Sequence, residues 1–208
     1  MARYIGAVCR LCRRQGEKLF LKGARCNTPK CALAKRSYPP GQHGYTKAKL
    51  SNYGLQLKEK QKIKRMYGIL EKQFRRLFRI AEKTKGVTGR ILLQLLERRL
   101  DNVIFRLGLG VSRRQARQIV RHNFVYVNSR RVNIPSYLVK EGDIIQIKAR
   151  DKVKEKLKEN LEISQERIIP NWLEFNPLEW KAKVLRLPEK EDIPQQIQEQ
   201  LIVELYSK

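Results

Sequence analysis

The most restrictive pattern in this chain is an apolar helical repeat that stops at two glycines and is followed at once by a second, basic repeat. Between residues 91 and 107 the apolar side chains recur every three or four positions and share one side of a predicted helix. They are Leu92, Leu96, Leu100, Val103 and Leu107. Gly108 and Gly110 end this segment. The pattern predicts a helix over 91–107, a short glycine turn and another helix.

The second predicted helix runs from Ser112 to His122. Ser112 can cap it, and Gln115 follows at the capping-box spacing. At about 100° per residue, its arginines gather within about a third of the circumference and its apolar residues occupy another arc. The arginines are Arg113, Arg114, Arg117 and Arg121, and the apolar residues are Ala116, Ile119 and Val120. This arrangement is typical of a nucleic-acid contact, although a solvated amphipathic helix shows the same pattern.

Short strands are predicted after the basic helix. Alternating apolar residues surround a turn at Asn128, Ser129 and Arg130, which indicates a hairpin. A third strand is predicted at 144–147, and further strands are expected within 170–188. Helices followed by a small, mainly antiparallel sheet predict an α+β fold for this part of the chain.

The net charge of +26 is large for 208 residues, and self-repulsion of that size disfavours a compact isolated protein. The excess of Lys and Arg lies in residues 1–150, whereas 151–208 are slightly acidic. No apolar run approaches the roughly 18 residues of a membrane helix, and the N-terminus lacks the pattern of a signal peptide. Because no lipidation signal or opposed apolar face accompanies the charge, we expect an intracellular protein that binds nucleic acid.

All four cysteines lie in the first fifty residues, at Cys9, Cys12, Cys26 and Cys31. A CxxC pair followed by a second pair across a short loop is typical of a closed four-thiolate metal site. Zinc is the expected ion and would be structural. An iron–sulfur cluster uses the same four thiolate ligands and is the alternative. Disulfides are the competing interpretation, but they are rare in a reducing compartment. His43 is a weaker candidate ligand in a turn rich in Gly and Pro.

The segment between the cysteines and the apolar repeat is predicted to be helical. Prolines and glycines within 37–44 indicate an ordered turn or an extended arm. Ser51 offers a cap for a helix that continues to Tyr67, and a second amphipathic helix is predicted over 70–83. A solvated helix is predicted over 151–163, and the apolar residues of 195–206 form a separate terminal segment.

Several motifs resemble a known family. Residues 99–103 (RLDNV), 112–117 (SRRQAR) and 127–132 (VNSRRV) are similar to the RNA-binding domain named after the small-subunit ribosomal protein S-four. The start RYIG at 3–6, the four cysteines, YPPGQHG at 38–44 and the ending EQLIVELYS at 199–207 also fit the bacterial S-four family. The resemblance runs nearly from end to end, and its separate motifs occur in the right order.

The resemblance implies a fold and a domain organisation. It implies a metal-binding basic arm at 1–50, a helical domain at 51–97 to which 194–208 return, and an S-four-type RNA-binding domain with its extension at 98–193. It implies that the four cysteines hold the metal and that the arginines of the Ser112–His122 helix face RNA. The basic residues expected to contact RNA are Arg3, Arg10, Arg13, Arg14, Lys22, Arg25, Lys35, Arg36, Lys58, Lys62, Arg65, Arg75, Arg76, Arg113, Arg114, Arg117, Arg121, Arg130 and Arg131.

The resemblance also implies a non-enzymatic function in the ribosome. Members bind a five-way junction in the 5′ domain of small-subunit ribosomal RNA early in assembly. They contribute to decoding accuracy through ribosomal protein S-five, and with S-three and S-five they line the channel through which messenger RNA enters. Many also repress translation of their own operon. We therefore expect a cytoplasmic ribosomal protein, with an organellar ribosome as the alternative.

Two departures and two alternatives accompany this interpretation. Many members lack some of the cysteines, and Asn123-Phe124 stands where the motif commonly has a glycine. An RNA-modifying enzyme with an S-four-type module is one alternative, but the chain has no P-loop or dinucleotide motif and only two distant histidines. A zinc-dependent DNA-binding regulator is the other, although charge spread over about 150 residues suits a large folded RNA better.

Overall fold

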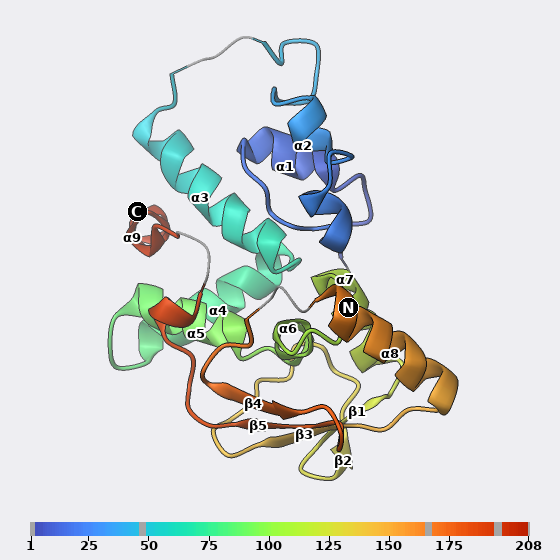
Figure 1. Ribbon diagram of the computed structural model, residues 1–208. Helices are drawn as coiled ribbons and strands as arrows, with labels where there is room; N and C mark the ends of the chain where they lie inside the picture. Colours follow the sequence, from blue (N-terminus) through green and yellow to red (C-terminus); the bar gives the residue numbers. More distant parts are fainter. Residues whose placement is uncertain (1–2, 46–48, 165–167, 194–196, 208) are drawn as a thin grey trace. The chain divides into compact units, whose positions relative to one another are not determined.

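The computed structural model describes residues 3–45, 49–164, 168–193 and 197–207 (Figure 1). The chain divides into two compact units. The first contains Met1–Leu92 together with Gln195–Lys208, and the second contains Leu93–Pro194. The sequence analysis placed the corresponding boundaries at 97/98 and 193/194. The chain-terminal segment thus belongs to the same unit as the N-terminal half.

The first unit is helical. Its elements are α1 (Cys9–Gln15), the 3₁₀ helix η1 (Gly23–Asn27), α2 (Ala32–Lys35), α3 (Asn52–Met66), α4 (Glu71–Lys83), the start of α5 (Thr88–Glu97) and α9 (Glu199–Tyr206). Ser51 caps α3, because its Oγ accepts a hydrogen bond of 3.2 Å from Gly54 N. The predicted apolar face of α4 is confirmed: Phe74, Leu77, Phe78 and Ala81 are buried.

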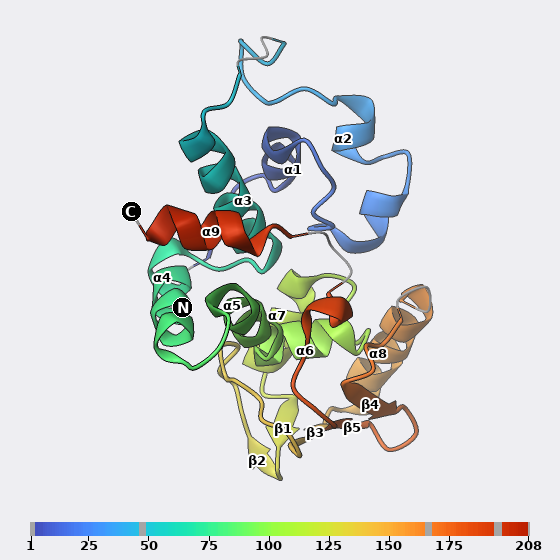
Figure 2. The same ribbon diagram turned by 90° about the vertical axis from the view of Figure 1, so that its left-hand side faces the viewer.

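Helix α9 lies beside α3, as Figures 1 and 2 both show. Gln56 Nε2 donates to Glu204 Oε2 at 2.9 Å, so a hydrogen bond joins the two helices. The Tyr206 ring stacks on Phe78 with 4.4 Å between centroids, and its hydroxyl donates to Glu71 Oε1 at 3.0 Å. These contacts fix the last turn of α9 against α4.

The second unit combines helices with one sheet. After α5 come α6 (Leu100–Arg106), α7 (Arg113–Arg121), β1 (Val125–Val127), β2 (Arg130–Arg131), β3 (Ile144–Ile147), α8 (Asp151–Ile163), β4 (Leu173–Asn176), β5 (Lys181–Val184) and the 3₁₀ helix η2 (Lys190–Asp192). The strands are antiparallel in the order β2-β1-β3-β5-β4. The predicted hairpin, third strand and later strands are therefore confirmed.

The core of this unit lies between the helices and one face of the sheet. Val125, Val127, Ile145 and Ile147 point from β1 and β3 into this core, where Ala116 and Val120 of α7 also lie. Leu100, Val103, Ile104 and Leu107 supply the contribution of α6, and Trp172 is fully buried beside β4. The alternation of apolar and polar residues in the strands thus assigns one face to the core.

The prediction of one continuous helix over 91–107 is wrong. The helix is broken at Arg98 and Arg99, because Arg99 has an extended backbone (φ −64°, ψ 133°). The freed groups pair with a neighbouring segment: Val139 N donates to Arg98 O at 3.0 Å, and Leu100 N donates to Tyr137 O at 2.8 Å. These tertiary hydrogen bonds offset the helical bonds that the break removes, a gain that periodicity alone does not reveal.

Candidate nucleic-acid interface

The N-terminus of α7 is held by its cap and by the glycine turn before it. Ser112 Oγ accepts a hydrogen bond of 3.3 Å from Gln115 N, as the capping motif predicts. The Gln115 side chain does not return to Ser112; its Oε1 accepts from Val111 N at 2.8 Å. A Cβ at Gly110 would lie 2.8 Å from Ala116 N, so only glycine lets the turn approach the helix this closely.

Helix α8 braces this turn from the other side. Asn160 is buried, and its Nδ2 donates to Leu109 O at 3.0 Å while its Oδ1 accepts from Gln115 at 3.3 Å. One amide side chain therefore connects α8, the glycine turn and the first turn of α7. The sequence analysis described the 151–163 helix as solvated and missed this buried asparagine.

The four arginines of α7 differ in their exposure. Arg114 and Arg121 are exposed. Arg113 is half-buried, donates from Nε to Asn102 Oδ1 at 2.9 Å and lies over the Phe105 ring at 4.5 Å. The surface that α7 offers to a ligand is therefore centred on the two exposed arginines.

Arg117 was predicted to lie on the exposed face of the helix, but it is buried. Only 8% of the residue is exposed, and its Nη1 donates to Asp101 Oδ2 at 3.2 Å. Asp101 in turn accepts from Arg99 Nε at 3.0 Å and Nη2 at 2.7 Å. Arg117 thus fixes α7 to the start of α6, because a charged group of this burial is stable only with a paired, hydrogen-bonded partner.

A second buried charge network holds the other side of α6. Glu97 is fully buried and accepts from Arg106 Nη2 at 2.6 Å and Asn102 Nδ2 at 2.7 Å. Asn102 also accepts the hydrogen bond from Arg113 Nε through its Oδ1. A charged group inside an apolar segment needs a hydrogen-bonded partner, and Arg106 and Asn102 supply it for Glu97.

The β1–β2 hairpin presents two further arginines. Asn128 and Ser129 both have positive φ, 48° and 66°, which matches a two-residue turn of type I′. Asn128 is fixed from both sides, since its Nδ2 donates to Asp143 Oδ1 at 2.8 Å and its Oδ1 accepts from Ile144 N at 3.0 Å. The predicted RNA contacts Arg130 and Arg131 lie exposed directly after this rigid turn.

The loop between α7 and β1 explains the departure from the family motif. Asn123 has φ 65°, in the left-handed region that favours glycine. Asparagine adopts this region more readily than most residues with a side chain. Asn123 therefore supplies the geometry for which the motif commonly uses glycine.

In the first unit, most of the predicted RNA contacts are exposed. The exposed side chains are Arg3, Arg10, Arg14, Lys22, Arg25, Lys35, Arg36, Arg75 and Arg76, and the half-buried ones are Arg13, Lys58 and Arg65. Burial lowers the pKa of Arg65, and the nearby Arg14 acts in the same direction. Lys62 is the exception: it is buried, and its Nζ lies 3.0 Å from Glu17 Oε2 and 3.6 Å from Glu59 Oε1. Lys62 is thus paired within the fold.

Arg13 and Arg14 organise the turn at 37–44. Arg13 Nε donates to Tyr38 O at 3.0 Å, and its guanidinium lies 4.8 Å from the centre of the Tyr38 ring. Arg14 Nη2 donates to Pro40 O at 3.4 Å. Tyr38 also contacts Tyr45 with 4.3 Å between ring centroids, and a hydrogen bond between the two side chains raises the pKa of Tyr45. The Pro-Gly segment is therefore an ordered turn whose tyrosines contact each other.

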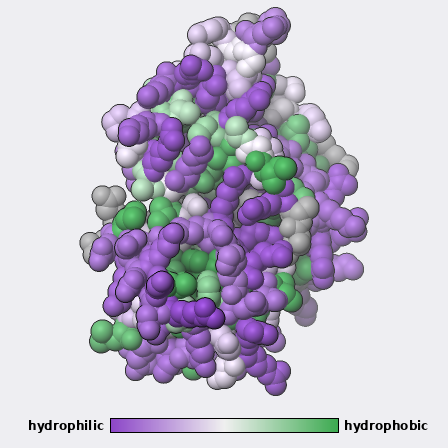
Figure 3. Space-filling view, turned by 90° about the vertical axis from the view of Figure 1, so that its right-hand side faces the viewer, coloured by the Kyte–Doolittle hydropathy of each residue, from purple (hydrophilic) through white to green (hydrophobic). Residues whose placement is uncertain are grey.

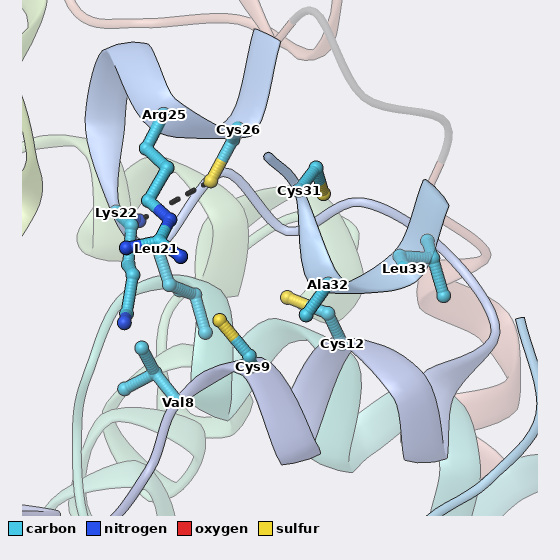
Figure 4. A pocket seen from close by; sticks show the side chains of 10 residues that line it. All are labelled: Val8, Cys9, Cys12, Leu21, Lys22, Arg25, Cys26, Cys31, Ala32 and Leu33. Atoms are coloured by element: carbon cyan, nitrogen blue, oxygen red, sulfur yellow. Dashed lines mark hydrogen bonds between the residues drawn. The ribbon is translucent and has the colours of Figure 1, made fainter. Parts of the chain in front are cut away.

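The four cysteines come together at one pocket, which Figure 4 shows. All are free thiols, and Lys22 N donates to Cys26 Sγ at 3.4 Å. Burial raises the pKa of the Cys12 and Cys26 thiols. No set of three His, Cys, Asp or Glu side chains in the described ranges has the geometry of a bound metal site. The thiols share one pocket, but their side chains are not placed as ligands.

The molecular face drawn in Figure 3 is mainly hydrophilic. In the view of Figure 3, hydrophilic side chains cover most of the molecular face, and hydrophobic ones form small separate groups. None of the helices within the described residues is long and apolar enough to span a membrane. Exposed basic residues occur on α7 and its hairpin in the second unit and, separately, on the N-terminal elements of the first unit.

Comparison with known proteins assigns the family. Residues 3–97 match the family described as Ribosomal protein S4/S9 N-terminal domain, and residues 98–145 match the S4 domain. The chain is 59% identical to the small ribosomal subunit protein uS4 of Thermodesulfovibrio yellowstonii and 62% identical to that of Acetivibrio thermocellus. Both comparisons cover 100% of each chain. This chain belongs to the uS4 family of small ribosomal subunit proteins.

Proposed function

We propose that the protein is a structural constituent of the small ribosomal subunit and acts by binding ribosomal RNA. The observation that carries this proposal is the exposed arginine surface of α7 and the β1–β2 hairpin, formed by Arg114, Arg121, Arg130 and Arg131. The buried pairs around Asp101 and Glu97 hold this surface on a rigid base. Exposed guanidinium groups suit phosphate oxygens, which they bind with two parallel hydrogen bonds.

The geometry favours RNA binding over the two alternatives from the sequence. The full-length relatives carry the name of a ribosomal protein, and ribosomal proteins of this kind are not enzymes. A regulator that reads duplex DNA places one helix in one groove. Here the exposed basic residues are distributed over α1, α4, α7 and the hairpin, which suits several segments of a large folded RNA.

The finer function follows the family resemblance. We infer that the chain binds the five-way junction in the 5′ domain early in assembly and influences decoding accuracy. S-five and S-three are its proposed protein neighbours, and messenger RNA passing into the subunit is a further proposed contact. The proposed location is the ribosome.

Cosedimentation tests the assignment. A tagged copy of the full chain, expressed in a bacterium, should sediment with small subunits in a sucrose gradient at high magnesium. It should remain bound to 5′-domain RNA when the other proteins are stripped with salt. Recovery only in the free-protein fractions would contradict the proposal.

We also propose that Cys9, Cys12, Cys26 and Cys31 hold a structural metal, with zinc as the expected ion and an iron–sulfur cluster as the alternative. Four thiols are suitable ligands for either group by their chemistry, and all four line one pocket, where the Lys22 amide donates to Cys26 Sγ. A bound ion would supply much of the folding energy of a segment that has few apolar residues. Metal analysis of anaerobically purified protein distinguishes zinc from iron with sulfide.

A further inference from the structure

One face of the sheet in the second unit is not covered by the helices of that unit. The core side chains of β1, β3 and β5 all point to the face where α6 and α7 pack. Strand alternation therefore places Tyr126, Gln146, Lys181 and Lys183 on the opposite face. Figure 1 shows the helices of this unit on one side of the strands and none on the other.

The strand register aligns polar side chains into a continuous row on this open face. Tyr126 pairs with Arg131 on one side and with Gln146 on the other, and Lys181 pairs with Gln146 and with Asn176. At about 4.8 Å between strands, the row extends about 19 Å. No carboxylate belongs to it.

Lys148 adds a cation to the aromatic centre of the row. Its Nζ lies 4.9 Å from the centre of the Tyr126 ring, and Lys148 is exposed. Beside the row, Lys183 pairs in register with Ile144 and with Glu174. Lys181 forms an exposed ion pair of 2.9 Å with Glu179. Four basic residues against these two acidic ones leave the open face positively charged.

We propose that this open sheet face is a second RNA-binding surface, which holds a single-stranded segment with a base stacked at Tyr126. The charge requires an anionic partner. The Tyr126 ring offers a stacking surface, and the amides of Gln146 and Asn176 can form hydrogen bonds to base edges. An acidic protein segment would use neither the ring nor these amides. Stacked bases rise about 3.4 Å each, so the row accommodates about five nucleotides.

The open face deepens the proposed function. It shares Arg131 with the hairpin, because Arg131 pairs in register with Tyr126, but it is separate from Arg114 and Arg121 of α7. Ala116 and Val120 of α7 pack on the core face of the sheet, so α7 covers the face opposite Tyr126. Loss of one surface should therefore leave the other intact. A negative result at Tyr126 would not remove the ribosomal RNA contacts of Arg114 and Arg121.

A charge-neutral substitution tests the proposal against the strong background of a +26 chain. The probe is an oligouridylate of about ten nucleotides, measured with the full-length protein by fluorescence anisotropy at fixed salt. Tyr126→Leu should weaken binding about tenfold, because stacking is lost while every charge stays. Tyr126→Phe keeps the ring and should bind like the parent. Tyr53→Leu, at an exposed tyrosine on α3, is the matched control and should also bind like the parent.

Crosslinking locates the site independently of affinity. An oligonucleotide carrying 5-iodouridine should crosslink to Tyr126, and it should still do so in Arg114→Glu/Arg121→Glu. Equal affinity of Tyr126→Leu and the parent, with the thermal unfolding of both unchanged, would overturn the proposal. Crosslinks confined to residues outside the sheet face would overturn it as well. The same holds if Tyr126→Leu binds polyglutamate more weakly than the parent but binds the oligonucleotide equally well.

Discussion

The Arg117 guanidinium donates to the Asp101 carboxylate across 3.2 Å, and both residues are buried. This pair joins the second turn of α7 to the start of α6. Arg117 was expected to contact RNA, but through this pair it instead positions the helix that carries the exposed arginines. The arginines of α7 therefore have two functions, and substitutions should separate them.

Arg117→Ala should destabilise the protein by about 3 kcal/mol, because it leaves a buried carboxylate with one partner fewer. Urea unfolding measured by circular dichroism checks this value. Arg121→Ala removes an exposed arginine of the same helix and should change the free energy of unfolding by less than about 0.5 kcal/mol. Equal stability of the two variants would show that the Arg117 pair contributes nothing to the fold.

Arg114→Glu combined with Arg121→Glu should weaken binding to 5′-domain RNA at least tenfold. Each lost phosphate contact should reduce the slope of log affinity against log salt by about one. Affinity measured by filter binding at several salt concentrations gives both quantities. The double variant Arg113→Glu/Arg117→Glu serves as the comparison. It should also lower the free energy of unfolding, because both arginines contact α6.

The Glu71 carboxylate should make the free energy of unfolding depend on pH in the acidic range. Burial disfavours its charge, but hydrogen bonds from Lys64, Lys60 and Tyr206 outweigh burial and lower its pKa to about 2. The unfolded carboxyl titrates near 4.5, so the stabilisation is complete above that pH and is lost as the pH falls towards 2. After allowance for partial exposure, the loss is about 1 to 2 kcal/mol.

Urea unfolding between pH 6 and pH 3 measures this dependence. Glu71→Gln should flatten it over this window, because the amide does not titrate. Glu82→Gln, at an exposed carboxylate of the same helix, is the control and should retain the slope of the parent. A parent protein and Glu71→Gln with identical pH profiles would contradict the assigned cause.

Cys26→Ser should reduce the metal content and open residues 1–35 to protease. The physical reason is that this segment has few apolar residues of its own and would depend on the proposed metal site for its stability. Metal analysis with limited proteolysis checks both effects. His43→Ala replaces the weaker candidate ligand and should retain metal and protease resistance; loss of metal in His43→Ala alone would reassign the site.

Much of this fold is predictable from local patterns. Ser51 and Ser112 mark helix starts correctly, and the alternation around Asn128 gives the hairpin, because capping and turn geometry depend on neighbouring residues. The break at Arg99 was missed because it is stabilised by hydrogen bonds to residues 137–139, far along the chain. The apolar period of 91–107 continues across the break and conceals it.

The candidate site is less predictable than the fold. Helical periodicity places Arg113 and Arg117 near Arg114 and Arg121, but it does not reveal Asn102 and Asp101, which draw the first two inward. Lys62 is likewise paired with Glu17, a residue distant in sequence. Exposure of a basic residue therefore depends on tertiary partners that a charge pattern does not contain.

The affinity of the full chain for 5′-domain RNA, measured against a large-subunit RNA fragment of equal length at the same salt, tests the central claim most directly. Equal length and salt keep the non-specific phosphate term constant, so any difference reports recognition of the RNA fold. The account predicts at least about a hundredfold preference for the 5′-domain RNA, a threshold set below the roughly thousandfold ratio at which specific DNA binding begins. Equal affinities for the two RNAs would contradict it.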